Sequence, residues 1–404
     1  MSFAHPLDFL LLNFHSGRCP LIISVPKEIH TGEKRISLIP ETVAKFKKMG
    51  YTIYVQKDAG VEAGFSNKQY EEAGAIIHDN IEKIYNEADI LVKVNVPSVH
   101  PLTNKQELHM MKENSYYVGF FFPLINLDLV RIALEKKVNV LAMDAIPRIT
   151  KAQRMDVLSS QTNLAGYRAV IIAANHSRKV FPLMMTAAGT VSPAKVVVLG
   201  AGVAGLQAIA TAKRLGAVVE VSDVRKEVKE QVQSLGAKYI EPPEVVEEEG
   251  GYAKEVSKEF LQKQQEILKK HLSNADIVIT TAQVPGKRAP LLIPEDMVKV
   301  MQPGSVIVDL AASTGGNCEL TEPDKIVEKY GVKIIGFTNV VSDVAFDASQ
   351  LYSKNIQAFI EYLTNKEGKF LTNLEDEIVK GCLITYNGEI LHPKVKELIT
   401  SAKT

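Results

Sequence analysis

The sequence lacks the marks of a disulfide-bonded or metal-binding protein. Its 404 residues include only three cysteines, Cys19, Cys318 and Cys382, which lie far apart and form no C-x-x-C pair. This usage argues against a disulfide framework or a zinc site and indicates a reducing compartment. The nine histidines contain no H-x-x-x-H pair, so we expect no metal centre.

Net charge and long apolar runs are also absent. Lysine and arginine together number 47, as do aspartate and glutamate, and this balance gives no indication of a nucleic-acid partner. No apolar run reaches the roughly 18 residues that cross a bilayer. The apolar stretch at residues 7–14 is interrupted by Asp8 and Asn13, and no lysine or arginine precedes it, so it makes a poor signal peptide. We expect residues 1–20 to be an N-terminal extension.

The sequence does contain two series of short apolar strands that alternate with amphipathic helices. With 46% apolar and 23% charged residues, its composition is that of an ordinary globular protein, long enough for two or three domains. Strands are expected at residues 21–25, 51–56, 89–95, 115–120 and 138–143, and again at 195–199, 218–222, 238–240, 275–280, 305–310 and 333–337. This alternation predicts an α/β fold with two Rossmann-like, doubly wound parallel-sheet domains.

The last part of the chain predicts that the first domain is discontinuous. After residue 339 the pattern changes to one long amphipathic helix, roughly residues 347–364, and such a helix often crosses back to an earlier domain. We therefore expect a first domain of residues 21–147 and 346–404. A Rossmann domain of residues 148–345 would be inserted between its two parts.

A glycine-rich turn carries the strongest functional signal. Residues 195–225 read as a strand, the turn Gly200-x-Gly202-x-x-Gly205, a helix and a second strand, which is the full context of a dinucleotide-binding fingerprint. The first glycine permits the tight turn, the second lets the backbone approach a pyrophosphate, and the third lets the helix pack on the strand. The N-terminus of the helix then offers N–H groups to the phosphates. A doubly wound domain that binds another nucleotide remains the alternative.

The second strand ends at an acid. Asp223 follows Gly205 by about 18 residues, near the position of the carboxylate that bonds a ribose 2′-OH. An acid there repels a 2′-phosphate and favours NAD(H) over NADP(H). Arg225 leaves NADP(H) open as an alternative, because a nearby arginine can bind the 2′-phosphate.

A long helical pattern at residues 153–174, between the two series, is expected to bridge the domains. Arg148, Gln153, Asp156 and Ser159 form an unusual polar set at its start. Asp156 and Ser159 are three residues apart and face the same way on a helix. An amide and a hydroxyl can hold a nicotinamide carboxamide, and an arginine can pair with a carboxylate to fix the loop. Residue types alone favour a plainer interpretation, a capped helix start with a surface ion pair.

A second candidate loop lies at residues 241–251, which are acidic and carry proline and glycine at the two ends. The acids themselves indicate a solvated loop. Gly250 and Gly251 precede Tyr252, and two glycines before an aromatic residue can hinge a loop over a cleft. Because ligands bind outside the carboxyl ends of parallel strands, the cleft between the two sheets is the expected site.

Several of these segments together resemble one family. V-P-K-E-x(6)-R-I-S at 25–37, P-R-I-T-K-A-Q-R-M-D-V-L-S-S-Q at 147–161, M-M-T-A-A-G-T-V at 184–191, the glycine turn, and G-G-Y-A-K-E at 250–255 are similar to the NAD(H)-binding alpha subunit of proton-translocating NAD(P) transhydrogenase. The resemblance runs from Leu21 to the C-terminus. Alanine dehydrogenases share the fold and the fingerprint.

The resemblance implies a Re/Si-specific transhydrogenase subunit that binds NADH. Hydride would pass directly to NADP⁺ held on a partner subunit, while a separate membrane subunit translocates protons. It also implies that two copies pair, and that the chain is soluble alone but attached at the cytoplasmic side of the inner membrane through its partners. The residues implied at nicotinamide are Arg148, Gln153, Asp156 and Ser159, and those implied along the rest of the dinucleotide are Gly200, Gly202, Val203, Ala204, Gly205, Asp223, Val224, Arg225, Gly251, Tyr252 and Ala282.

Alanine dehydrogenase is the competing assignment. That family has a lysine where this chain has Asn95 and an aspartate where it has Ser313. It also has a histidine where this chain has a phenylalanine in G-F-F-F-P, residues 119–123. Reduction of a keto or imino acid needs a positioned proton donor, and these replacements remove it. Arg35 remains from the shared motif, and we expect its role to be structural. A non-catalytic NAD-binding module is the third possibility.

Overall fold

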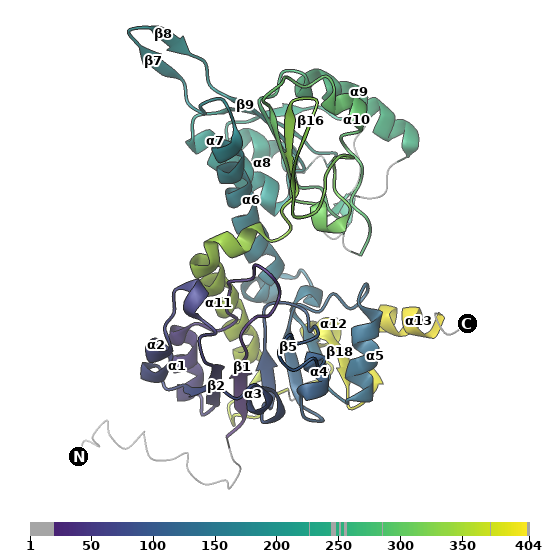
Figure 1. Ribbon diagram of the computed structural model, residues 1–404. Helices are drawn as coiled ribbons and strands as arrows, with labels where there is room; N and C mark the ends of the chain where they lie inside the picture. The colour runs from purple at the N-terminus through teal and green to yellow at the C-terminus, as the bar shows by residue number, and fades with distance from the viewer. Residues whose placement is uncertain are drawn as a thin grey trace, which may run out of the picture.

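The computed structural model describes residues 20–225, 227–243, 248–249, 252–253, 257–284, 286–371 and 373–401. Two α/β domains lie one above the other, joined by α6 (Val157–His176) and by the segment that leads into α11 (Ala345–Leu363), as Figure 1 shows. This arrangement confirms the predicted fold class. The exact domain boundaries remain a prediction.

The sheet of the first domain has the strand order β19-β18-β6-β5-β4-β1-β2-β3 among the described residues. Its first six strands in sequence are parallel, and β18 and β19 pair antiparallel at one edge. The strands are β1 (Ile22–Val25), β2 (Thr52–Gln56), β3 (Ile76–His78), β4 (Ile90–Val92), β5 (Tyr116–Gly119), β6 (Asn139–Ala142), β18 (Leu383–Tyr386) and β19 (Glu389–Ile390). The helices around them are α1 (Pro40–Lys48), α2 (Asn67–Glu72), α3 (Ile81–Asn86), α4 (Glu107–Met110), α5 (Leu127–Glu135), α12 (Glu377–Cys382) and α13 (Pro393–Ser401), with short 3-10 turns η2 (Val61–Ala63) and η3 (Met143–Ala145).

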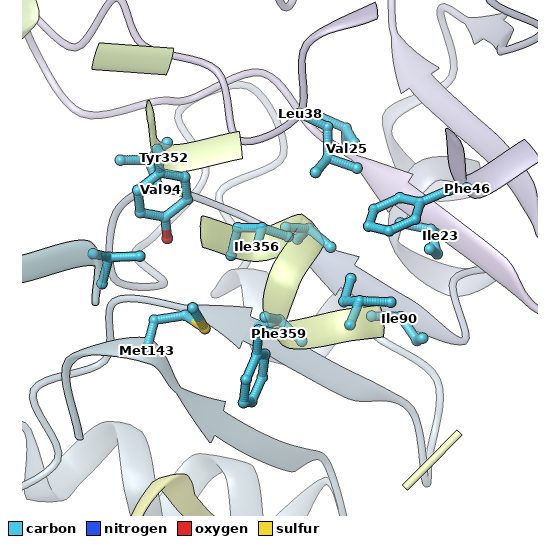
Figure 2. Close-up of a cluster of buried hydrophobic side chains, with 14 of the residues drawn as sticks. Ile23, Val25, Leu38, Phe46, Ile90, Val94, Met143, Tyr352, Ile356 and Phe359 are labelled. Atoms are coloured by element: carbon cyan, nitrogen blue, oxygen red, sulfur yellow. The ribbon is translucent and has the colours of Figure 1, made fainter. Parts of the chain in front are cut away.

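Helix α11 completes the core of this domain, although residues 143–344 separate it from β6 in the sequence. Tyr352, Ile356 and Phe359 point into a buried cluster with residues of β1 and α1, which Figure 2 shows. All three side chains are fully buried. The long amphipathic pattern was therefore a sound basis for predicting a return to the first domain.

Strands β3, β18 and β19 were not expected from the sequence. They have only two to four residues. Strands β3 and β19 form the two edges of the sheet, where continuous apolar runs are not required, and β18 lies between β19 and β6, directly after α12. One local signal was available for the last pair. Asn387 and Gly388 connect β18 to β19, with φ values of 49° and 81°, as an Asn-Gly hairpin turn demands.

The second domain has the strand order β11-β10-β9-β14-β15-β17-β16, which is the Rossmann order with an antiparallel strand, β16, added at the edge. Its strands are β9 (Lys195–Leu199), β10 (Val218–Ser222), β11 (Lys238–Ile240), β14 (Ile277–Thr280), β15 (Val306–Asp309), β16 (Ile326–Lys329) and β17 (Val332–Ile335). Its helices are α7 (Val203–Arg214), α8 (Val228–Ser234), α9 (Lys258–Leu272) and α10 (Glu295–Val298), with η5 (Ala312–Thr314). The central strands are buried on both faces, which explains their unbroken apolar sequences.

Two short hairpins lie outside these sheets. Strands β7 (Met184–Thr186) and β8 (Gly189–Val191) pair antiparallel and project from the second domain, away from the first (Figure 1). Strands β12 (Glu248–Glu249) and β13 (Tyr252–Ala253) pair in the same way. No helix within the described ranges has both the length and the apolar character needed to cross a membrane.

The bridging helix begins later than expected. Residues 150–155 form a 3-10 helix, η4 (Thr150–Met155), and α6 starts only at Val157. The reason is the cap: the carboxylate of Asp156 accepts a hydrogen bond from the N–H of Ser159 at 2.8 Å, which satisfies a backbone donor at the helix start. The α-helix therefore begins directly after the acid.

A buried ion pair connects the first domain to both chain crossings. Glu33 and Arg35 follow β1 and are 5% and 6% exposed. The guanidinium of Arg35 donates to both oxygens of Glu33 and, through Nη1, to Gln161 of α6 at 3.0 Å. Glu33 also accepts from Ser342, in the second crossing, η6 (Val340–Val344), at 3.1 Å.

The ion pair gives a prediction about stability and pH. Burial would raise the pKa of Glu33, but the charge and hydrogen bonds of Arg35 lower it to about 2. Arg35→Met would leave a buried carboxylate unpaired, so we expect the free energy of unfolding at pH 7 to fall by about 3–5 kcal/mol. Urea titration would measure it. Because the native pKa lies below the ordinary 4.5, the pair stabilises the fold above pH 4.5 and loses that contribution as pH falls towards 2.

The difference between the wild type and Arg35→Met should therefore shrink across this acid range. The double variant Glu33→Gln/Arg35→Met is the control, since it removes both charges and should recover part of the loss. A pH-independent difference would contradict the assignment.

Candidate functional site

The glycine turn leaves space where a pyrophosphate would approach. Gly200 follows β9 with φ +100°, a conformation that favours glycine. A Cβ added to Gly205 would lie 1.9 Å from the carbonyl oxygen of Gly200, so the helix and the turn touch through their backbones. A Cβ on Gly202 would meet no atom within 4 Å. Val203 and Ala204 open α7, whose first N–H groups have no partner within the helix.

Asp223 closes the turn from the neighbouring strand. Its Oδ2 atom accepts a hydrogen bond from the N–H of Ala201 at 2.7 Å, and its Oδ1 atom accepts from the N–H and Nε of Arg225. Nη2 of Arg225 also donates to Oδ2 at 2.8 Å. Both side chains are buried, and Val224 between them is half-buried. The arginine is thus held against the acid, and the carboxylate stands beside the glycine turn.

A third segment borders the turn, the loop after β14. Thr281 donates a hydrogen bond to the carbonyl of Gly200 at 3.0 Å. The amide of Asn317 bonds both the N–H and the C=O of Ala282, at 3.0 and 2.8 Å. Asp309, fully buried at the end of β15, in turn accepts the N–H of Asn317 at 2.8 Å. Of these residues the sequence pointed only to Ala282.

Thr281, Asn317 and Asp309 were missed because their roles depend on distant pairing. Asn317 contacts a loop some 35 residues earlier in the chain. The only local signal was an acid at the end of a buried apolar strand, in V-I-V-D. Such acids mark the carboxyl edge of a parallel sheet, where ligands bind.

The polar set before α6 is only partly brought together. Asp156 accepts from the hydroxyl of Ser159 at 2.6 Å as well as from its N–H, so these two form the helix cap. Gln153 and Arg148 are exposed on the 3-10 segment and the loop before it. The plainer interpretation, a capped helix start, therefore describes Asp156 and Ser159, while Gln153 faces solvent.

The second candidate loop is largely outside the described residues. Gly251 is not among them. Tyr252 is described by its backbone, which pairs with Glu249 between β13 and β12. The expected hinge motion stays a prediction.

Polar and charged side chains of the first domain bond to one another. Asn95 donates to Glu33 at 2.8 Å, and Ser313 of the second domain is exposed. Lys93 is fully buried and forms ion pairs with Glu107 and Glu28. Lys93, two residues before Asn95, is thus paired inside the first domain.

The aromatic run 120–122 follows β5 at the carboxyl edge of the first sheet. Phe121 is fully buried and Phe122 is 39% exposed. The carboxylate of Asp144 accepts the N–H groups of both. Farther along the same loop, a Cβ added to Gly286 of the second domain would lie 3.9 Å from Leu124, so loops of the two domains approach one another here. Among the residues with described positions, no group of three or more histidine, cysteine or acidic side chains could hold a metal ion.

These features define a dinucleotide-binding α/β protein with two Rossmann-like domains. The family models "Alanine dehydrogenase/PNT, N-terminal domain" and "Alanine dehydrogenase/PNT, C-terminal domain" match residues 24–165 and 169–393. An NAD(P) transhydrogenase subunit alpha chain of Rhodospirillum rubrum is 49% identical over 379 residues, which cover 92% of this chain and 98% of the relative.

Solved structures agree with these matches. The transhydrogenase from Sinorhizobium meliloti has a TM-score of 0.81 and 42% identity, covering 91% of this chain and 99% of that one. An L-alanine dehydrogenase has a TM-score of 0.79 and 26% identity, covering 94% and 99%. The chain belongs to the alanine dehydrogenase/PNT family, and within it the chain is similar to the NAD(P) transhydrogenase alpha subunits. The resemblance drawn from the sequence motifs is confirmed.

The open space at Gly202 gives a prediction for the glycine turn. Its φ of −74° suits any residue, so Gly202→Ala should leave the unfolding transition unchanged. The added methyl would occupy the approach to the turn, and we expect NADH binding to weaken by at least about tenfold, or ~1.4 kcal/mol. Titration of NADH fluorescence would measure this.

Gly205→Ala is the matched comparison. Its Cβ would collide with the backbone of Gly200, so it should lower the unfolding midpoint itself. Normal NADH affinity in a folded Gly202→Ala variant would place the pyrophosphate elsewhere.

Proposed function

We propose that this chain is the NAD(H)-binding subunit of an NAD(P) transhydrogenase and passes hydride directly between NADH and NADP⁺ held on a partner subunit. One observation carries the proposal: a dinucleotide turn closed by Asp223 lies in a chain that matches a transhydrogenase subunit alpha relative over 98% of that relative's length. The coenzyme supplies the hydride chemistry, and the residues of this chain bind and orient it.

The geometry of the turn suits NAD(H). The gap at Gly202 can take the pyrophosphate, and the first turn of α7 directs N–H groups and a positive dipole end towards it. Asp223 can accept a ribose 2′-OH. A 2′-phosphate would bring its negative charge against the carboxylate, while Arg225, the group suited to neutralise it, is already bonded to that carboxylate. NADP(H) would therefore be assigned to the partner.

The segment from Arg148 to Ser159, which we name the nicotinamide loop, would orient the nicotinamide. Its Asp156–Ser159 cap makes the start of α6 rigid, and Gln153 is exposed beside it. Transfer between two nicotinamides needs no general acid, because the hydride passes directly and no proton joins the acceptor. Holding reacting atoms in a near-attack geometry can supply roughly 7–11 kcal/mol of the barrier.

An amino-acid dehydrogenase is the second candidate, favoured by the likeness to L-alanine dehydrogenase. Its chemistry needs a proton donor near a keto acid. An amide and a hydroxyl, Asn95 and Ser313, stand at two of the positions concerned, and phenylalanines stand in the third segment. Arg35, a potential carboxylate-binding group, is bonded to Glu33 and Gln161 instead. This arrangement supports transfer between coenzymes over the dehydrogenase.

The assembly would be split among chains. A separate membrane-spanning subunit would translocate protons, another would hold NADP(H), and this chain would attach peripherally at the cytoplasmic side through them. The name of the Rhodospirillum rubrum relative, which describes it as one portion of a divided subunit alpha, supports such an arrangement.

Two copies of the chain would pair through the β7–β8 hairpin. Every residue of this hairpin is exposed, including Leu183 and Met184 at its base and Met185, which is 77% exposed. An isolated two-stranded hairpin is marginally stable in water, and exposed apolar strands with unpaired edges favour association. A second copy would cover both the side chains and the edges.

Reconstitution tests the proposed reaction. The purified chain should bind NADH and show no turnover with pyruvate and ammonia. Addition of an NADP(H)-binding transhydrogenase subunit should produce hydride transfer from NADH to an NADP⁺ analogue, followed by absorbance. Turnover with pyruvate and ammonia would favour the dehydrogenase, and silence with saturating partner would favour the binding module.

The nicotinamide loop can be tested in the same system. Gln153→Ala removes an exposed amide, and Asp156→Asn keeps a capping side chain while removing the charge. Both should slow hydride transfer by about tenfold or more, and raise the dissociation constant of NADH less, because an orienting group acts chiefly in the transition state. Weaker binding with an unchanged transfer rate would remove the assigned role.

The hairpin gives a prediction about assembly. Met185→Glu should convert a dimer into a monomer in analytical ultracentrifugation, because it places a charge within the apolar contact. Leu102→Glu is the matched control: Leu102 is 78% exposed in the first domain, and its replacement should leave the dimer intact. An unaltered dimer in Met185→Glu would exclude the hairpin as its contact.

A further inference from the structure

Helix α6 joins the two functional parts of the proposed site. Its first turn is capped by Asp156 at the nicotinamide loop. Farther along, it packs on α7, whose first turn borders the phosphate-binding turn. Roughly 15 Å of helix, at about 1.5 Å per residue, separates Asp156 from the contact at Gly166.

Gly166 is an unusual residue for its position. It lies in the middle of a 20-residue helix, where glycine is less favourable than alanine by about 1 kcal/mol. The structure shows what the glycine permits. A Cβ added there would lie 2.1 Å from the carbonyl oxygen of Ala204 and 2.9 Å from its Cα atom. The backbones of α6 and α7 therefore touch with no side chain between them.

A second backbone contact continues this one. Ala204 is followed by Gly205, whose own Cβ would lie 1.9 Å from the carbonyl oxygen of Gly200. Helix α6, the first turn of α7 and the glycine turn are thus stacked in direct backbone contact. Side-chain contacts can adjust by changing rotamers, but backbone contacts of this kind cannot yield without moving a whole helix.

We propose that Gly166 is a positioning residue, whose contact with Ala204 sets the distance between the nicotinamide loop and the glycine turn. The inference rests on the proposed function, because it requires one NADH molecule to extend between these two places. The pyrophosphate end is held by the turn, and the nicotinamide end is held by a loop attached to α6. A shift of α6 on α7 therefore moves the nicotinamide relative to its anchored phosphates.

One hydrogen bond beside the Gly166–Ala204 contact also helps to hold α6 in place on α7. Nδ2 of Asn163 on α6 donates to Oε1 of Gln207 on α7 at 3.3 Å. Asn163 and Gly166 are three residues apart and lie on the same face of α6. This bond resists sliding of the two helices where the glycine sets their separation.

The test is Gly166→Ala in the chain reconstituted with an NADP(H)-binding subunit. The methyl must push α6 away from α7, and a misplacement of about 1 Å can cost 10²-fold in rate. We expect single-turnover hydride transfer to fall about 10- to 100-fold, with a change of less than about threefold in the NADH dissociation constant, because the turn keeps its own contacts with α7. The fluorescence emission of bound NADH should also shift, since it reports the surroundings of the nicotinamide without requiring transfer.

Val170→Ala is the matched control. Val170 is fully buried one turn farther along α6, and its truncation destabilises the same core by leaving a cavity, without separating the helices. Transfer and emission should stay near wild-type values in this variant. If Val170→Ala and Gly166→Ala lost hydride transfer to the same extent, the glycine would have only a structural role and the proposal would be overturned. Wild-type transfer and emission in Gly166→Ala would also overturn it.

Asn163→Ala decides the matter should Gly166→Ala fail to fold. It introduces no clash, and we expect a fall of about two- to fivefold in transfer with an unchanged NADH dissociation constant. Unchanged transfer and emission in Asn163→Ala would then overturn the proposal. Absence of transfer in the wild-type reconstitution is a different result: it would refute the proposed function, and the emission of bound NADH would still report whether Gly166 positions the nicotinamide.

Discussion

The relative placement of the two domains depends on the buried pair Glu33–Arg35. The chain passes between the domains twice, through α6 and through η6, and the pair bonds to both crossings, at Gln161 and Ser342. Burying a charged group costs free energy unless the group is paired and hydrogen-bonded. Loss of either bond would therefore destabilise the folded state. The loops of the two domains, which approach one another at Leu124 and Gly286, keep their relative position only if such crossings are held. The pair therefore matters for the site although it touches none of the proposed cofactor positions.

The sequence predicted the features that depend on residues close together in the chain. The glycine turn and Asp223 were found because a strand, a tight turn and a helix start impose residue types at fixed spacing, and α11 was found because its amphipathic face must be buried. Strands β18 and β19 were missed, because β19 has only two residues at the edge of the sheet and β18 follows α12 without an intervening loop. Asn317 was missed for another reason. Its side-chain amide bonds the backbone N–H and C=O of Ala282, as the backbone of a neighbouring strand would. No rule of sequence spacing predicts a side chain in that role.

One fold in this family carries two chemistries, and the polar groups of the first domain suggest how they differ. Burial raises the pKa of Glu28 and Lys93 opposes that effect, so this region is a set of charges that compensate one another. Asn95 and Arg35 likewise bond to Glu33. Under the proposed function, side chains that are paired in this way would not serve a keto acid as a charge partner or a proton donor. The dinucleotide turn in the other domain is unaffected, because function resides in sites and not in the fold as a whole.

The proposed reaction includes no acid–base step, so its rate would depend on geometry. The parts of the protein that set the distance between the two ends of the coenzyme would then have to be rigid. Flexible side chains are poor spacers, since each rotamer change alters the distance they set. Backbone contacts at Gly166 and Gly205 avoid that variation, at the expense of helix propensity. The placement of glycine at both contacts is therefore consistent with a site selected for the accuracy of a distance. The same reasoning explains why the Asp156–Ser159 cap matters: a spacer helix is useful only if its first turn, which carries the nicotinamide loop, does not fray.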